Sequence, residues 1–211
     1  MGAANGVIAG ALFVVLCFLL PDTISAMLPA QRPALSPESA NRVNYSSSEF
    51  INNSCGKTEY PDVCLSTLRG YADTVHDNPR QLAQMAISVT LRRSRRASAY
   101  VSYVIHSNTV NDHYVQEVLG DCQDTLGNAV DEIKDSLGEL RKMTDPGSGE
   151  FKFQLSNAQT WMSAALSNVD TCSDEFDKVQ ASQLKSNVVD RVKRMRTVTA
   201  NALALVNLCA A

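Results

Sequence analysis

The sequence predicts an all-α protein: an antiparallel four-helix bundle with an N-terminal helical hairpin extension and two disulfides. Three observations favour this class. Apolar residues recur at steps of three and four over long segments, alternating strand-like runs are sparse, and only 6% of the residues are aromatic. The chain has 211 residues, which is enough for one domain with a sizeable core.

Residues 1–26 are expected to form a cleaved secretory signal peptide. The stretch Val7–Leu20 is almost entirely apolar, Pro21 ends it, and small residues follow up to the expected cleavage point after Ala26. This stretch is too short for a convincing membrane span, and no later one approaches the required length, so no membrane association is expected after cleavage. Residues 27–44 hold three prolines without periodicity and are expected to be a flexible N-terminus of the mature protein.

Residues 45–211 are expected to form the functional domain, with the N-terminal hairpin at 45–76 and the bundle at 77–211. Cys55 and Cys64 enclose a small loop, and a disulfide is the default interpretation in a secreted chain. A zinc site would need further ligands at suitable spacing, which neither His76 nor His106 supplies. Two sequons predict N-glycosylation, at Asn44 (Asn-Tyr-Ser) and at Asn52 (Asn-Asn-Ser).

Four long helices are expected in the bundle. The first starts at Pro79, after the capping residues Asp77 and Asn78. A Pro/Gly turn at 145–149 joins the second helix to the third and makes them antiparallel neighbours. The expected ranges are 79–107, 113–143, 150–171 and 173–209.

The second expected helix has an apolar face and an acidic face. Its antiparallel pairing with the third helix brings Cys122 and Cys172 to the same end of the hairpin, which predicts a second disulfide. Cys17 leaves with the signal peptide, so Cys209 is left over and is expected to be a buried free thiol. The residues of the acidic face recur at steps of three and four. They are Glu117, Asp121, Asp124, Asn128, Asp131 and Asp135.

Charge and motif content exclude several classes of function. The net charge is −3, which argues against a nucleic-acid partner. The three histidines are scattered, and no Gly-x-Ser-x-Gly motif or phosphate-binding loop is present. The acidic residues line the exterior of a helix and do not converge in a pocket. We therefore expect neither an enzyme nor a cofactor or metal site. The arginine run at 92–96 is either a solvated helix face, an anion patch, for example for an acidic polysaccharide, or a partner contact.

Four blocks of sequence, in order, carry a family resemblance: CGKTEYPDVC at 55–64, LGDCQDTLGNAVDEI at 119–133, TWMSAALSNVDTCSDEF at 160–176 and TANALALVN at 199–207. They resemble the plant invertase and pectin methylesterase inhibitor family over nearly all of the mature chain. The resemblance implies a four-helix bundle with an N-terminal helical hairpin. It also implies a secreted, non-catalytic inhibitor of the apoplast or cell wall that binds its target enzyme, one to one.

The third and fourth blocks favour the pectin methylesterase branch, and the Pro-Lys-Phe motif of invertase inhibitors is absent. A cell-wall or vacuolar acid invertase remains the alternative target. Similar domains precede some pectin methylesterases, but no catalytic domain follows here, so action in trans is expected. The resemblance implies that one bundle face covers the enzyme's substrate cleft, with Asn128 and Gln159 departing from the family in residue type. The implied contacts are Asp124, Asn128, Asp131, Gln159 and Thr171.

Overall fold

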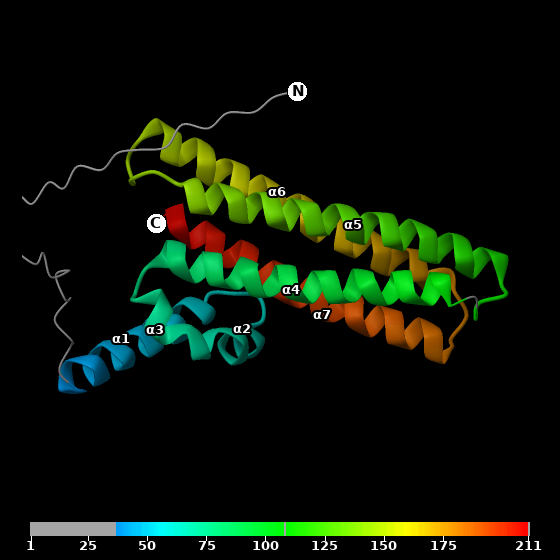
Figure 1. Cartoon of the computed structure of the whole chain (residues 1–211), viewed down its shortest axis with the longest axis horizontal. Coiled ribbons are helices and arrows are strands. Elements are labelled where there is room, and N and C mark those ends of the chain that lie inside the picture. The colour runs from blue at the N-terminus through cyan, green and yellow to red at the C-terminus, as the bar shows by residue number, and fades with distance from the viewer. Residues whose placement is uncertain (1–36, 108, 211) are drawn as a thin grey trace, which may run out of the picture. The chain divides into compact units, whose positions relative to one another are not determined.

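The computed structural model describes residues 37–107 and 109–210, with side chains from residue 46 onward (Figure 1). The predicted signal peptide and residues 27–36 lie outside the described residues. All regular structure in the described ranges is helical, which confirms the predicted class. The helices are α1 (Pro37–Cys55), α2 (Pro61–Leu68), α3 (Ala72–Val75), α4 (Pro79–His106), α5 (His113–Lys142), α6 (Gly149–Glu175) and α7 (Gln183–Asn207), with 3₁₀ turns at Arg69–Tyr71, Phe176–Lys178 and Leu208–Ala210.

Helices α4 to α7 form an antiparallel bundle, in which α5 contacts α4 and α6, and α7 contacts α6 and α4 (Figure 1). The core lies along the apolar stripes predicted from the sequence. Leu126 and Ile133 of α5, Met162 and Val169 of α6 and Val192 of α7 are all buried. Burial of these stripes supplies most of the driving force for packing.

Each bundle helix begins at a side-chain cap, which satisfies a backbone N–H that the first helical turn leaves free. The predicted start at Pro79 is confirmed, with Asn78 as its cap. In each cap, a side-chain oxygen accepts from the backbone N–H three residues later. The four caps are Asn78 with the N–H of Gln81 (3.1 Å), Asp112 with that of Val115 (3.2 Å), Ser148 with that of Phe151 (3.0 Å) and Ser182 with that of Lys185 (3.1 Å).

The predicted start of the last helix at Ser173 is wrong. α6 continues to Glu175, a 3₁₀ turn follows, and α7 begins only at Gln183. The physical reason is that Ser182 caps α7, while Phe176 and Val179 bury their side chains from the connecting segment rather than from a helix. The apolar spacing of these two residues matches the helical period, so the sequence pattern predicted a helix across the connecting segment.

The predicted boundary between a flexible N-terminus and the hairpin also differs from the structure. α1 begins at Pro37, inside the range 27–44 that was expected to lack structure. Proline fits the first helical turn, because its missing N–H has no partner there in any case. Pro37 therefore begins a helix, and its presence did not indicate missing structure.

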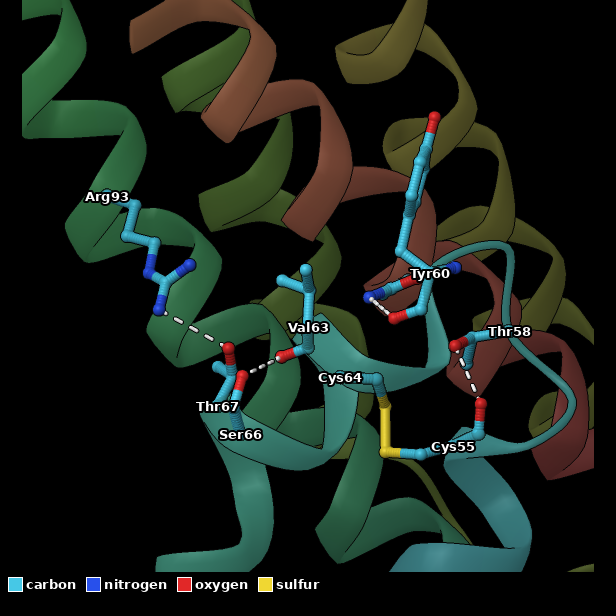
Figure 2. The surroundings of a disulfide bond; sticks show 9 residues. Cys55, Thr58, Tyr60, Val63, Cys64, Ser66, Thr67 and Arg93 are labelled. Carbon is cyan, nitrogen blue, oxygen red and sulfur yellow. Dashed lines mark hydrogen bonds between the residues drawn. A yellow bond between two sulfur atoms is a disulfide. The ribbon is translucent and has the colours of Figure 1, made fainter. Parts of the chain in front are cut away.

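The extension packs mainly on α4 and α7, and its first disulfide joins Cys55 at the end of α1 to Cys64 in α2, as predicted (Figure 2). Asn201, buried in α7, fastens the loop between these helices. Its side-chain oxygen accepts from the Tyr60 N–H and its amide donates to the Tyr60 carbonyl, both at 2.9 Å. Arg196 adds ion pairs to Glu59 and to Asp170 of α6. The extension thus leaves the opposite pair, α5 and α6, as the less covered side of the bundle.

Candidate functional site

The acidic face of α5 points away from the bundle core. Asp124, Asn128 and Asp131 are all exposed, as the sequence predicts. They lie opposite the fully buried Leu126 and Ile133, because residues three and four apart share one side of a helix. Three side chains implied by the family resemblance therefore lie together on one exposed helix surface.

Several cross-links hold α5 against α6, among them a hydrogen bond from the Gln154 amide of α6 to the Lys142 carbonyl of α5 at 3.3 Å. Cys122 and Cys172, both fully buried, form the predicted disulfide near one end of the pair. Nearer the loop that connects the two helices, the buried Ser136 hydroxyl donates to the Ala158 carbonyl at 2.9 Å. The Asn168 amide donates to both carboxylate oxygens of Glu132, at 2.9 and 3.0 Å. These bonds hold the two helices in one arrangement before any partner arrives.

Burial raises the pKa of Glu132, the Asn168 hydrogen bonds oppose this shift, and the neighbouring charge of Asp135 adds to it. The carboxylate is therefore held in place by an amide rather than neutralised by a cation. Its role is to align α5 with α6.

Thr171 lies in a groove between the start of α5 and the end of α6. The side chain is exposed, and its hydroxyl donates to the Ser167 carbonyl at 3.0 Å, which fixes its orientation. The structure thus places Thr171 in the same groove as Glu117 and Asp121, which belong to the acidic face of α5. This acidic groove has a volume of about 450 Å³ and is lined by Tyr114, Glu117, Val118, Asp121, Thr171, Asp174, Glu175 and Lys178.

Glu175 is half-buried, whereas the other acids of this groove, Glu117, Asp121 and Asp174, are exposed. Its Oε2 atom is buried and has no hydrogen-bond partner among the described residues. Burial raises the pKa of the Glu175 carboxyl, and the charge of Asp121 raises it further. The groove therefore contains a carboxyl group that gains a proton more readily than an ordinary glutamate.

Gln159 does not join the acidic face of α5. It is half-buried and lies eleven residues, three helical turns, before Asp170, so the two share one side of α6. Asp170 accepts from the Arg196 Nε atom of α7 at 2.8 Å. Gln159 accordingly lies on the α7 side of α6, apart from the acidic groove.

Trp161 is a surface feature that sequence reasoning missed. Its side chain is 39% exposed. It lies seven residues, two helical turns, before Asn168, and so on the side of α6 that faces α5. The available signal was its position between Ala158 and Met162 but outside their apolar register. We define the α5/α6 face as Asp124, Asn128, Asp131, Trp161 and Thr171.

Cys209 forms no disulfide, but it is half-buried rather than buried as predicted. Burial raises the pKa of its thiol to about 11, and the charge of Arg80 lowers it only partly. Since the thiolate is the reactive form, this cysteine is chemically quiet at neutral or acidic pH.

The remaining predictions concern glycosylation, metal binding and membrane-spanning helices. Asn52 is exposed on α1, while the side chain of Asn44 lies outside the described residues, so glycosylation stays a prediction for both. Within residues 46–107 and 109–210, no group of three or more His, Cys, Asp or Glu side chains could hold a metal ion. No helix in the described ranges is long and apolar enough to cross a membrane.

The chain is similar to several plant proteins. It is 35% identical to "Pectinesterase inhibitor 11" of Arabidopsis thaliana, over 92% of this chain and 94% of that protein. It is 34% identical to a "21 kDa protein" of Daucus carota, over 77% of this chain and 84% of that one. A crystal structure of a mutant pectin methylesterase inhibitor from Arabidopsis shares the fold, with a TM-score of 0.61 and 20% identity, over 75% of this chain and 95% of that one.

The family model described as "Plant invertase/pectin methylesterase inhibitor" matches residues 49–205. This range begins within α1 and ends within α7, so it includes both disulfides and the whole α5/α6 face. The chain therefore belongs to the plant invertase/pectin methylesterase inhibitor family.

Proposed function

We propose that this chain is a secreted inhibitor that binds a pectin methylesterase one to one and covers its substrate cleft with the α5/α6 face. Such binding would limit the de-esterification of pectin in the cell wall. The choice of target is supported by relatives of 34–35% identity that are named pectinesterase inhibitors. The family description names invertase as well, so an acid invertase is the alternative target.

The observation that carries the choice of face is its rigidity combined with its exposure. Asp124 and Asp131 project from a helix that the Cys122–Cys172 disulfide ties to α6. Side chains that are ordered before binding lose little conformational entropy when a partner arrives. The face can therefore present several polar contacts to an enzyme at low entropic cost.

Trp161 supplies the apolar part of the proposed contact. Tryptophan is among the residues that most often dominate interface energies, and a partly exposed one has surface left to bury. Asp124 and Asp131 of the same face would then supply orientation and specificity. This combination of an exposed aromatic side chain with several exposed polar ones suits a protein partner, because interfaces of that kind join an aromatic anchor to a polar rim.

A titration of enzyme activity tests the proposed function. The purified chain would be added, in separate experiments at pH 5 to 6, to a pectin methylesterase and to an acid invertase. We expect stoichiometric loss of methylesterase activity while invertase activity is unchanged. Loss of invertase activity alone would contradict the proposed target and favour the alternative. No effect on either enzyme, across several isoenzymes, would contradict inhibition altogether.

The affinity for the methylesterase is expected to rise as the pH falls from 7 to 5. The raised pKa of Glu175 means that this carboxyl gains its proton above the usual glutamate range. Protonation lowers the negative charge of a groove that also contains Glu117, Asp121 and Asp174, with Lys178 as its only cation. Repulsion of carboxylates on the partner decreases in the same direction.

Dissociation constants at pH 5 and pH 7, measured at constant ionic strength, test this expectation. The Glu175→Gln variant should bind more tightly than the unmodified chain at pH 7 and show a smaller pH dependence. Glu49→Gln removes the same charge from the exposed surface of α1 and serves as the control. Equal dissociation constants at the two pH values would contradict the prediction.

A further inference from the structure

A second charged surface lies on the other side of the bundle, between α4 and α7. Arg93 and Arg96 of α4 face Arg191 and Arg194 of α7 across a groove of about 400 Å³. We call this the arginine groove. It concentrates four guanidinium groups in a chain whose net charge is −3, so its local potential is opposite in sign to that of the whole molecule.

Two of the four arginines are held in place by neighbours. The Arg191 guanidinium stacks on the Tyr100 ring, 3.7 Å from its centroid, and donates to the Asn187 carbonyl at 2.8 Å. Arg93 donates one hydrogen bond to the Thr67 hydroxyl at 3.3 Å (Figure 2). Each guanidinium carries five N–H donors, so most of their donors remain available.

No carboxylate of residues 46–107 and 109–210 lies at ion-pair distance from these four arginines. Arg196, also on α7, differs in this respect, because Glu59 and Asp170 both pair with it. Four like charges that converge without an ion-paired carboxylate repel one another, and a bound polyanion would relieve that repulsion. The groove therefore has the character of an anion site rather than of a structural ion-pair network.

We propose that the arginine groove binds a polyuronate strand, a polysaccharide that carries one carboxylate on each sugar. The planar guanidinium fork matches a carboxylate with two parallel hydrogen bonds, and four forks on two helices suit a ligand with repeated carboxylates. The anion site rests on the geometry alone. The choice of polyuronate rests on the proposed function, because a methylesterase creates such carboxylates in pectin.

The arginine groove and the α5/α6 face lie on different helix pairs. One molecule can therefore hold de-esterified pectin through α4 and α7 while α5 and α6 bind the enzyme. This arrangement would concentrate the inhibitor where the methylesterase has already acted.

Binding of defined oligogalacturonates to the full chain tests the inference without any enzyme present. The probes are a fully de-esterified oligomer of about ten sugars and its fully methyl-esterified counterpart, titrated calorimetrically at pH 6 and low salt. We expect the de-esterified oligomer to bind, more weakly at higher salt, and the esterified one not to bind. Failure of the de-esterified oligomer to bind, or equal binding of both oligomers, would overturn the proposal.

Two double variants locate the site. Arg96→Gln with Arg194→Gln removes two groove charges that make no hydrogen bond or ion pair to residues 46–107 and 109–210, and should weaken binding by on the order of tenfold or more. Arg95→Gln with Arg141→Gln removes two exposed charges outside the groove and should leave affinity unchanged. If both double variants weakened oligogalacturonate binding equally, the effect would come from the overall charge, and the proposal of a site in the arginine groove would be overturned.

The same experiments separate this inference from the proposed function. The groove variant should inhibit the methylesterase as well as the unmodified chain when a short soluble substrate is used. Loss of oligogalacturonate binding with inhibition intact would support two separate surfaces. Binding of a sulfated polysaccharide or of nucleic acid in preference to oligogalacturonate would overturn polyuronate as the occupant.

Discussion

Replacing Cys122 and Cys172 together by alanine is expected to lower the free energy of unfolding by about 4 kcal/mol, the chain-entropy value for a loop of about 50 residues. Both cysteines are fully buried between α5 and α6, so alanine avoids placing a hydroxyl group in the core. The corresponding fall in melting temperature is about 8–16 °C for a domain of this size. Thermal unfolding followed by circular dichroism measures it.

Two matched variants calibrate this result. Cys55→Ala with Cys64→Ala opens only the small loop between α1 and α2, for which the same model gives about 2.7 kcal/mol. Cys209→Ala removes an unpaired cysteine and should have a much smaller effect than either pair. If the Cys122–Cys172 variant melts at the same temperature as the unmodified chain, the disulfide does not hold α5 against α6.

Replacing Thr171 by arginine is expected to reduce affinity for the methylesterase on the order of 30-fold or more, which corresponds to loss of about 2 kcal/mol at an interface hot spot. Thr171 is exposed in the acidic groove, so a long side chain there would obstruct a partner without disturbing the core. Inhibition titrations give the change in affinity, and an unchanged melting temperature shows that the fold is intact.

Thr197→Arg is the matched control for this substitution. Thr197 lies on α7 and donates its hydroxyl to the carbonyl four residues earlier, as Thr171 does on α6. The two variants therefore make the same chemical change at threonines with the same backbone hydrogen bond, on different sides of the bundle, although Thr197 is half-buried and Thr171 is exposed. Similar loss of inhibition in both would contradict the α5/α6 face as the contact surface.

Much of the fold could be predicted from local signals. The steps of three and four along α5 and α6 placed Leu126 and Met162 in the core, and the capping pair at Asn78 and Pro79 located the start of α4. Both disulfides followed from helix pairing and loop length. Membership in an inhibitor family also confirms the prediction that the chain is not an enzyme.

What the sequence concealed depends on contacts between distant segments. The apolar spacing at Phe176 and Val179 continued across a break in the helix, which only the cap at Ser182 reveals. The unpartnered oxygen of Glu175 depends on how α5 packs on α6. Likewise, the arginine run on α4 was visible, but its pairing with Arg191, about 100 residues later, was not.

Hydroxyl-radical footprinting of the free chain and of its complex with the methylesterase tests the central claim most directly. Four exposed aromatic side chains act as reporters: Tyr103 on α4, Tyr114 on α5, and Phe153 and Trp161 on α6. If the α5/α6 face binds the enzyme, Trp161 and Tyr114 become protected from oxidation while Tyr103 reacts as in the free chain. Protection of Tyr103, with Trp161 and Tyr114 as reactive as before, would contradict the account.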